Sequence, residues 1–426
     1  METKTGKKKD SVSRRDFIKT STAAGMATLL AGTGGIFAAG SDKIRVGVIG
    51  CGGRGTGATK DCLNASAEVE IIAMGDLFQD RLDDSLESLK KDFADRVKVT
   101  PETSFVGFDA YKKVLTCDID LVIMAPPPHF RPMHLQAAIA AGKHVFMEKP
   151  VAVDPPGARS IIASSQLARQ KGLALVAGTQ RRHEVHYLEI MKRIHDGAIG
   201  EIVGGQCYWN QGELWVKEKQ PGWSDMEWQC RNWLYFTWLS GDHIVEQHVH
   251  NIDVINWAIG ELPVKCMGMG GRQVRTGPQY GNIFDHFAVE FEYPNGARVM
   301  SMCRQTPGCA DRVAERVVGT RGVAHGHGLI EGENAYKYEG PHPNPYVVEH
   351  ADLIKSIREG KPLNEGQRIA ESTLCAIMGR MSAYTGREIS WKWVMNESKL
   401  DLTPPEYAFG DLPVAPVAVP GQTPLV

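Results

Sequence analysis

Several features are absent from this 426-residue chain, and each absence excludes a class of protein. Lys and Arg number 48 against 50 Asp and Glu, so the chain lacks the basic excess that is typical of nucleic-acid binding. Its nine cysteines include no C-x-x-C pair, and their odd number argues against a disulfide framework, so we expect mostly buried free thiols. Internal repeats are missing, and the only biased composition is a proline-rich tail after Leu402.

Long apolar runs are also missing, because residues 20–40 are too rich in Gly, Thr and Ala to supply about 20 strongly apolar residues for a membrane span. This stretch follows a basic segment with the pair Arg14 and Arg15, and small residues stand near Ala39. The arrangement resembles a twin-arginine export signal, which we place at residues 1–40. We therefore expect a periplasmic protein without a membrane anchor, with the twin-arginine export machinery as a partner.

A glycine-rich turn follows directly after a predicted strand. The apolar run that ends at Ile49 leads into Gly50-Cys51-Gly52-Gly53-Arg54-Gly55, which has the G-x-G-x-x-G spacing. The first glycine permits a tight turn, the second lets the backbone approach a pyrophosphate, and the third lets the next helix pack on the strand. The N-terminus of that helix offers free N–H groups to the phosphates. The pattern therefore favours dinucleotide binding over an ordinary glycine turn.

A second predicted strand, residues 69–74, strengthens this interpretation because it ends in Gly75-Asp76, about where an acid binds the adenosine ribose. No basic residue directly follows Asp76, which favours NAD over NADP, although Arg81 could reverse the preference. Because the periplasm holds no free pool of nicotinamide nucleotide, we expect the cofactor to be tightly bound. The cofactor-binding residues predicted in these two segments are Gly50, Gly52, Gly53, Arg54, Gly55 and Asp76.

Strand and helix patterns alternate over residues 41–178, which predicts an α/β domain with a doubly wound parallel sheet of the Rossmann type. A buried strand at 118–124 runs into a loop that contains Pro127 and His129. Ligands of open α/β sheets bind at the C-terminal ends of strands, where this loop lies. We therefore add Pro127 and His129 to the predicted cofactor site.

A further predicted strand leads into Glu148-Lys149-Pro150. Together with Gly142-Lys143-His144-Val145 and the preceding Pro-Pro-His loop, this pattern resembles the Gfo/Idh/MocA oxidoreductases, from about Lys43 to about Gly386. The resemblance implies that Lys149 reaches the reacting hydroxyl and the nicotinamide, and that Glu148 lies at the cofactor. A buried ammonium can lower the pKa of a neighbouring hydroxyl and stabilise the developing alkoxide. A solvent-facing lysine at a strand end is the alternative.

Predicted strands and flanking helices indicate a second, α+β domain at residues 179–386. Tyr293 to Ala297, with the sequence Tyr-Pro-Asn-Gly-Ala, predicts a hairpin turn between two of its strands. The family resemblance implies an open, mostly antiparallel sheet covered by helices on one face, and a homo-oligomer formed through the bare face. We assign residues 387–426 to a C-terminal extension that lies over another surface, such as a neighbouring subunit.

Six of the nine tryptophans lie between residues 209 and 238. Flat aromatic faces suit the C–H faces of sugar rings, so this concentration suggests carbohydrate binding. A tryptophan-rich core or a dimer contact explains it equally well, and we expect only one or two of these side chains to touch substrate. The predicted substrate-binding residues are Arg182, Trp209, Asn232, Trp238 and His248.

Glu246 and His250 are four residues apart and would share one face of a helix. The family usually has Asp-x-x-x-His here, which implies that His250 is the general base for the hydroxyl proton, a role that its ordinary pKa near 6.5 suits. We therefore predict Lys149, Glu246 and His250 as the catalytic residues. Glu246 replaces a common Asp and His248 replaces a common Gly, so the substrate of a relative cannot be transferred to this chain.

His243, Glu246, His248 and His250 also suggest a metal site, because zinc accepts His and carboxylate ligands. Residues 248 and 250 cannot share a helical face with residues 243 and 246, and no standard zinc signature fits the spacing. We therefore predict no metal.

These features predict an exported NAD(P)-dependent oxidoreductase that transfers hydride between a hydroxyl carbon of a sugar, polyol or glycoside and a tightly bound nicotinamide cofactor. The main alternative is a redox-neutral enzyme, similar to glycoside hydrolase family 109, that cleaves a glycoside through a transient keto intermediate. A non-enzymatic sugar-binding module is a third reading, against which the retained Lys149, Glu246 and His250 argue.

Overall fold

The computed structural model describes residues 43–426, so the predicted export signal lies outside the described residues. Among the described helices, none is long and apolar enough to cross a membrane. All nine cysteines are free thiols, and seven of them are buried, which confirms the expectation from their number and spacing.

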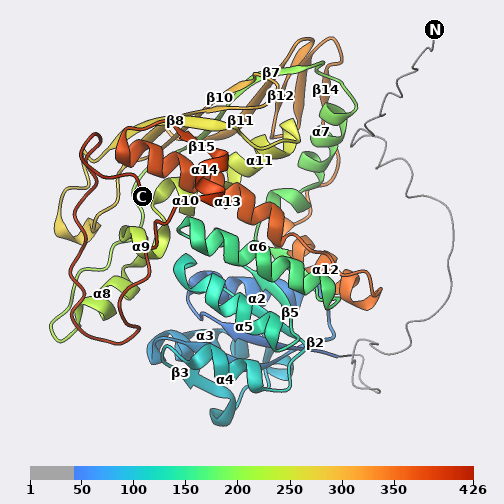
Figure 1. The fold of residues 1–426 in the computed structure, drawn as a ribbon. Helices are drawn as coiled ribbons and strands as arrows, with labels where there is room; N and C mark the ends of the chain where they lie inside the picture. Colours follow the sequence, from blue (N-terminus) through green and yellow to red (C-terminus); the bar gives the residue numbers. More distant parts are fainter. Residues whose placement is uncertain (1–42) are drawn as a thin grey trace, which may run out of the picture. The chain divides into compact units, whose positions relative to one another are not determined.

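The first part of the chain builds a six-stranded parallel sheet in the order β3-β2-β1-β4-β5-β6, which confirms the predicted Rossmann topology (Figure 1). Its strands are β1 (Ile44–Ile49), β2 (Val69–Asp76), β3 (Ser104–Val106), β4 (Leu121–Met124), β5 (His144–Met147) and β6 (Leu175–Ala177). Its helices are α2 (Gly53–Ala65), α3 (Gln79–Phe93), α4 (Ala110–Thr116), α5 (Arg131–Ala140) and α6 (Pro155–Gln170). Helices cover both faces, so the central strands read as continuous apolar runs.

The second part builds a nine-stranded sheet in the order β14-β13-β12-β11-β7-β10-β9-β8-β15. The pair β7 and β10 is parallel and the other pairs are antiparallel, as the open, mostly antiparallel prediction requires. Its strands are β7 (Ile202–Gln211), β8 (Lys265–Gly271), β9 (His286–Glu292), β10 (Arg298–Gln305), β11 (Arg312–Gly319), β12 (Gly322–His325), β13 (Leu329–Gly332), β14 (Tyr336–Lys337) and β15 (Ile389–Ser390). The predicted hairpin turn joins β9 to β10, with Gly296 at a φ of +83°.

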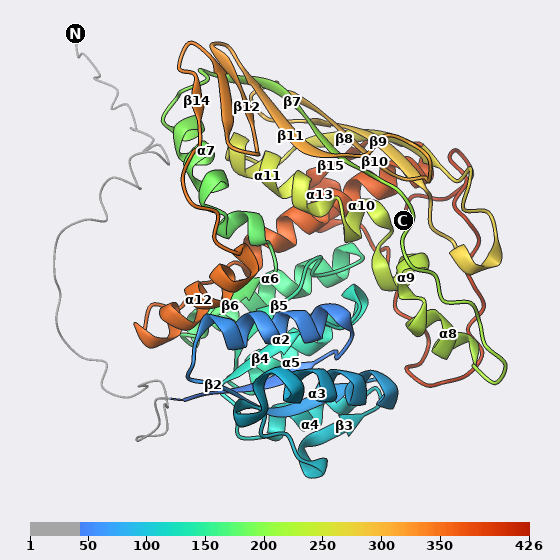
Figure 2. The same cartoon turned by 180° about the vertical axis from the view of Figure 1, so that it is seen from behind.

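Helices lie against one face of this second sheet, as Figures 1 and 2 show from opposite sides. The helices of this part of the chain are α7 (Val185–His195), α8 (Asp225–Arg231), α9 (Thr237–Ser240), α10 (His243–Glu246), α11 (Val249–Ile259), α12 (Pro345–Arg358), α13 (Gly366–Thr385) and α14 (Trp391–Asn396). Helices α11 and α13 are almost wholly buried, and their apolar residues pack with those of β9 and β10 in one core.

Two late helices return to the first sheet. Leu353, Ile354 and Ile357 of α12 belong to the same buried cluster as the residues of β1 and β2, while Ile369 and Ala370 of α13 pack in the cluster on its other side. Segments far apart in the sequence therefore share each core. We propose the boundary between residues 178 and 179 on the path of the chain, because β6 ends at Ala177 and the chain then enters the second sheet's helices.

The C-terminal extension packs against other parts of the same chain. The backbone N–H of Leu402 donates to Asp154 of α6, and further along the tail Gly410 accepts from Met226 of α8. The extension therefore lies over other parts of the same chain, and a contact with a neighbouring subunit stays a prediction. In Figure 1 the tail runs as a loop beside α8 and α9.

Candidate active site

The loop between β1 and α2 is shaped by its glycines. Gly50 has a φ of +89°, and a Cβ there would lie 2.5 Å from the backbone nitrogen of Pro126. A Cβ on Gly55 would lie 1.8 Å from the carbonyl oxygen of Gly50, so α2 can pack this closely only with glycine. A Cβ on Gly53 would meet no atom within 4 Å, and the helix begins without a side-chain cap. An open loop with free helical N–H groups fits a bound pyrophosphate.

Asp76 ends β2 beside this loop. Its Oδ2 accepts a hydrogen bond from the backbone N–H of Cys51 at 2.6 Å, and its Oδ1 accepts one from Phe78 at 2.9 Å. Burial raises the pKa of the carboxyl above its ordinary value, and the two hydrogen bonds oppose this rise. The carboxylate stands where ribose hydroxyls are bound in dinucleotide folds.

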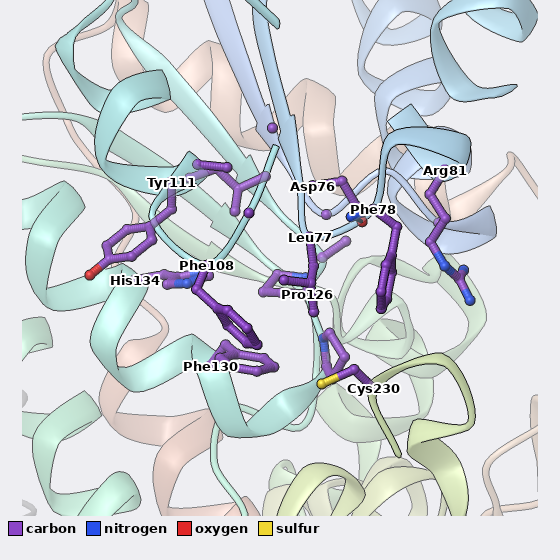
Figure 3. A pocket seen from close by; sticks show the side chains of 18 of the residues that line it. Asp76, Leu77, Phe78, Arg81, Phe108, Tyr111, Pro126, Phe130, His134 and Cys230 are labelled. Atoms are coloured by element: carbon purple, nitrogen blue, oxygen red, sulfur yellow. Dashed lines mark hydrogen bonds between the residues drawn. The ribbon is translucent and has the colours of Figure 1, made fainter. Parts of the chain in front are cut away.

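A pocket opens beside Asp76 at the C-terminal ends of the strands (Figure 3). Figure 3 shows Phe108 and Phe130 next to each other on one side, while Phe78 and Arg81 lie toward the other side. The lining also includes Gly50, Gly52, Pro126, Pro127, Tyr111, His134, and Cys230 and Trp233 from the second part of the chain. A largely apolar, aromatic pocket of this kind suits the flat adenine end of a dinucleotide.

Arg81 lies over the same end of the pocket. Its Nη1 would be 3.2 Å from a Cβ on Gly52. A carboxylate and a guanidinium therefore both lie at this end of the pocket. Asp76 suits the ribose of NAD, whereas Arg81 suits the 2′-phosphate of NADP.

Arg54 and Glu148 contact each other, although both were predicted to contact the cofactor. Arg54 Nε donates to Glu148 Oε1 at 2.6 Å, and its guanidinium lies 4.9 Å from the centre of the Tyr346 ring. Asp61 also pairs with Arg54, at 3.3 Å. The ion pair ties the first turn of α2 to the turn after β5, so it fixes the segment that carries Lys149.

Lys149 reaches from the end of β5 into the second part of the chain. Its Nζ donates to the backbone carbonyl of Glu246 at 2.7 Å and lies 3.2 Å from Glu246 Oε1. Both side chains are almost buried, at 12% and 9% exposure, while Glu246 Oε2 is buried without a hydrogen-bond partner. This paired, nearly dry ammonium fits the charge-stabilising role predicted for Lys149.

His250 lies close to this ion pair and is buried. Burial lowers the pKa of its imidazole well below the ordinary 6.5, and the cations of Lys149 and Arg181 lower it further. The ring is therefore neutral near pH 7, which is the state that a general base needs. Trp209 of β7 stacks on it, with ring centres 5.7 Å apart and planes inclined by 22°.

Glu246 and His250 do not share one helix, which corrects the helical-face argument. Glu246 ends α10, and α11 begins at Val249. The backbone N–H of His248 bonds to the carbonyl of His243, five residues back, so the chain widens between the two helices. The widening turns His248 away, and its Nε2 meets Ser301 Oγ at 2.7 Å.

Three of the predicted substrate-binding residues have their polar groups engaged by protein partners. His248 is fully buried beneath β10, as just described. Asn232 is also fully buried, and its amide bonds to Lys217 and Gln279. Arg182 forms a paired contact with Asp253, with Nε–Oδ2 at 2.8 Å and Nη2–Oδ1 at 3.0 Å. These contacts engage the polar groups with other residues of the chain, so substrate binding by the three residues stays a prediction.

Trp238 and His129 lie together under the tail. Their rings meet edge to face at 5.0 Å, and His129 Nε2 lies 2.8 Å from the hydroxyl of Tyr407. Burial lowers the pKa of His129 to about 4. Of the predicted substrate residues, Trp209 is therefore the one that the structure brings to His250.

Sequence reasoning missed Arg181 and chose its neighbour. The Arg181 guanidinium lies 5.5 Å from the centre of the Trp209 ring and pairs with Glu315 of β11 at 2.7 Å. Glu315 Oε1 also accepts from Asn251 of α11. The buried Glu315 carboxylate of β11 therefore contacts both Arg181 and Asn251 of α11. Nothing in the local Arg-Arg sequence distinguishes the two arginines.

No group of three His, Cys, Asp or Glu side chains converges as a metal site within residues 43–426. The four residues considered from sequence point apart. His243 Nε2 meets the carbonyl of Trp209, whereas His248 turns to Ser301 and Glu246 to Lys149.

Both parts of the chain match models of the same protein family. The profile described as "Oxidoreductase family, NAD-binding Rossmann fold" matches residues 44–179, and the GFO/IDH/MocA C-terminal domain matches residues 187–325. The twin-arginine translocation signal matches residues 11–31, in agreement with the signal predicted from sequence.

Curated relatives are distant. A scyllo-inositol 2-dehydrogenase (NADP(+)) of Bacillus subtilis is 29% identical over 49% of this chain and 52% of its own length. A 2,7-anhydro-N-acetylneuraminate hydratase of Escherichia coli is 27% identical over 42% and 44%. A glycosyl hydrolase family 109 protein of Shewanella pealeana is 25% identical over 73% and 66%. The chain thus spans about half the length of the first two relatives.

Solved structures share the fold. The scyllo-inositol dehydrogenase of Lactobacillus casei has a TM-score of 0.63 at 18% identity, covering 82% of this chain and 98% of that one. The aldose-aldose oxidoreductase of Caulobacter crescentus, complexed with glycerol, has a TM-score of 0.64 at 17% identity, covering 82% and 99%.

Proposed function

Because the chain belongs to the Gfo/Idh/MocA family of NAD-binding oxidoreductases, we propose that it oxidises or reduces a CH–OH carbon of a sugar, polyol or glycoside. The observation that carries this proposal is the meeting of Lys149, at the end of β5, with Glu246 and the neighbouring His250. They meet at the strand ends of the sheet that carries the glycine loop. Trp209 stacks on His250 and supplies an aromatic wall there.

The described residues fit a proton-transfer role. NAD, when bound in the glycine loop, would supply the hydride acceptor or donor. Neutral His250 can take the hydroxyl proton onto a ring nitrogen, while the Lys149 ammonium stabilises the alkoxide that forms. Glu246 holds Lys149 in place through two contacts, and Arg54 holds the adjoining turn through Glu148.

Redox-neutral glycoside cleavage is the second candidate function. The similarity to a family 109 protein over 73% of this chain favours it. In such a reaction a ring carbon is oxidised transiently, the neighbouring C–H becomes acidic, the aglycone is eliminated, water adds, and the carbon is reduced again. The same base and ammonium would serve both reactions, so the residues alone do not separate them.

We also propose that the cofactor is NAD, tightly bound, and that the protein works in the periplasm. Asp76 supports NAD, as its carboxylate already accepts hydrogen bonds at the edge of the glycine loop. The export signal supports the compartment and the need for a retained cofactor.

Two measurements test these proposals. Denaturing the purified protein should release a nicotinamide dinucleotide, identified by its absorbance and mass. Incubation with a panel of glycosides and polyols should then yield a keto-sugar if the enzyme is a dehydrogenase, or a free aglycone without net reduction if it cleaves glycosides. A protein that neither contains nor binds a dinucleotide contradicts both functions, and one that binds sugars without either product is a binding module.

A homo-oligomer formed through the bare face of the second sheet is a further proposal. Met267 and Met269 of β8 are 61% and 72% exposed, and Met300 and Met302 of β10 are 38% and 40% exposed. Across the strands, Met269, Ala288 and Met302 stand in one row. Such a contiguous apolar patch is typical of an interface.

Substituting Asp at both Met269 and Met302 should therefore shift the assembly toward monomers, because paired charges would be desolvated at the contact. Light scattering after size-exclusion chromatography measures the mass of the assembly. Leu188→Asp is the control, because Leu188 is an exposed residue of α7 and lies outside the sheet. This substitution should leave the mass of the assembly unchanged. A wild-type protein that is already monomeric contradicts the proposal.

A further inference from the structure

The pocket beside Asp76 has one wall that comes from the other part of the chain. Cys230 of α8 and the following Trp233 line it together with Gly52, Asp76 and Phe78. In Figure 3 Cys230 lies at the lower edge, opposite the strand ends. The segment between β7 and α10 therefore crosses the open side of the cleft.

Arg231 fastens this segment to the first part of the chain. Its Nη1 and Nη2 lie 2.9 and 3.2 Å from the two carboxylate oxygens of Asp80, in the first turn of α3. Its guanidinium lies 3.9 Å from the centre of the Phe78 ring. These hydrogen bonds hold the pKa of Asp80 below its ordinary value. A planar guanidinium that pairs with a carboxylate and stacks on a ring is a contact that lysine cannot reproduce.

The tail adds an outer layer over the same loops. The Phe409 ring stacks on Phe78 at 5.9 Å and meets Phe108 at 5.4 Å. Tyr407 bonds through its hydroxyl to His129, in the loop after β4. Phe78 and Phe108 both line the pocket, so the tail covers its aromatic walls from outside.

The two layers are also joined to each other. Gln229 Nε2 donates to the carbonyl of Leu412 at 2.6 Å, and the backbone N–H of Leu412 donates to Asp225 Oδ2 at 3.2 Å. These two hydrogen bonds join α8 directly to the tail. Opening the cleft requires the loss of the Arg231–Asp80 pair and of the ring contacts of Phe409.

We propose that α8 and residues 407–412 form a clamp that governs the exit of the dinucleotide, with Arg231, Tyr407 and Phe409 as its positioning residues. The inference rests on the proposed function, since it needs a dinucleotide in the pocket. The clamp acts in one subunit and bears on retention rather than on the chemical step. It explains how a cofactor can persist in a compartment that does not resupply it.

Exchange of isotopically labelled NAD tests the clamp without any substrate. The purified full-length protein is mixed with excess labelled NAD, and the bound fraction is followed by mass spectrometry. Arg231→Met combined with Phe409→Ala should exchange at least about tenfold faster than wild type, since about 1.4 kcal/mol of lost contact corresponds to tenfold. Arg193→Met is the matched control, because Arg193 of α7 also pairs with a carboxylate, Glu189, and stacks on a ring, Tyr336, but does not line the pocket.

Equal exchange rates in the double variant and the wild type, with equal cofactor content and equal thermal midpoints, overturn the clamp while leaving the proposed function intact. Exchange within seconds in the wild type overturns it as well. A protein that neither contains nor takes up NAD refutes the proposed function and the clamp together. The NAD exchange rate of Arg231→Lys should be close to that of Arg231→Met, because both variants lose the bidentate pairing and the ring stacking of the guanidinium.

Discussion

Replacing Lys149 with methionine should lower kcat/KM by about 10³-fold, within the range for removal of a charge-stabilising or proton-transfer group. Methionine keeps the unbranched stem of lysine up to its Cε but removes the ammonium that would stabilise the alkoxide. The bound dinucleotide should remain, because the glycine loop and Asp76 are unchanged. Steady-state kinetics with the substrate found in the panel, together with absorbance of the released cofactor, measure both effects.

A structural explanation of that loss can be tested separately. Lys149→Met leaves the buried Glu246 carboxylate without its cation, which by itself destabilises the protein. Adding Glu246→Gln removes this charge, so the double variant should recover the unfolding midpoint but not the activity. Recovery of activity in the double variant would show that Lys149 acts only by balancing the charge of Glu246.

The pH dependence of the wild type tests His250. The acid limb of its pH–activity profile should lie below pH 6.5, because the pKa of His250 is depressed and its neutral form is required.

Asp253→Asn should destabilise the protein by about 3–5 kcal/mol, as expected when one partner of a buried ion pair is removed. The Asp253 side chain is 2% exposed and pairs with both Arg182 and Arg368, while Ser372 donates to it at 2.8 Å. Asparagine keeps the shape but leaves two arginines without their shared anion. Because Asp253 lies one turn after His250 on α11, the base should also lose its fixed position. Urea unfolding followed by fluorescence measures the stability.

Asp92→Asn provides the matched comparison for this substitution. Asp92 pairs with Lys60 at 2.6 Å, but the Asp92 side chain is 44% exposed and that of Lys60 is 31% exposed. The same chemical change there should leave the urea midpoint almost unchanged, because exposed pairs are screened by water and salt. If the two substitutions shifted the midpoint equally, burial of the Asp253 cluster would not be the source of its stability.

The cofactor end of the site could be predicted from the sequence because its rules are local. The G-x-G-x-x-G turn, the acid after β2 and the Glu-Lys-Pro turn each depend on a few consecutive residues. The same holds for the hairpin turn between β9 and β10, because the Pro-Asn-Gly sequence at residues 294–296 specifies the turn by itself.

The substrate end could not be predicted in the same way. The turn between α10 and α11 is one residue wider than a regular helical turn, and His248 therefore faces Ser301. The spacing of residues in the sequence does not indicate this wider turn. Arg181 and Arg182 are adjacent and identical in chemistry, and only the distant Glu315 and Asp253 separate their directions. Most of the clustered tryptophans pack with Phe78, Phe130 and the tail, which favours the core explanation for them.

The return of α12 to the first sheet has a consequence for biosynthesis. Leu353, Ile354 and Ile357 fill the core beneath β1 and β2, so a nascent chain that has passed only its first 180 residues lacks part of that core. The core of the nucleotide-binding half is therefore completed only after residue 357 has been synthesised. We therefore expect the proposed dinucleotide to bind stably only after α12 has packed against the first sheet.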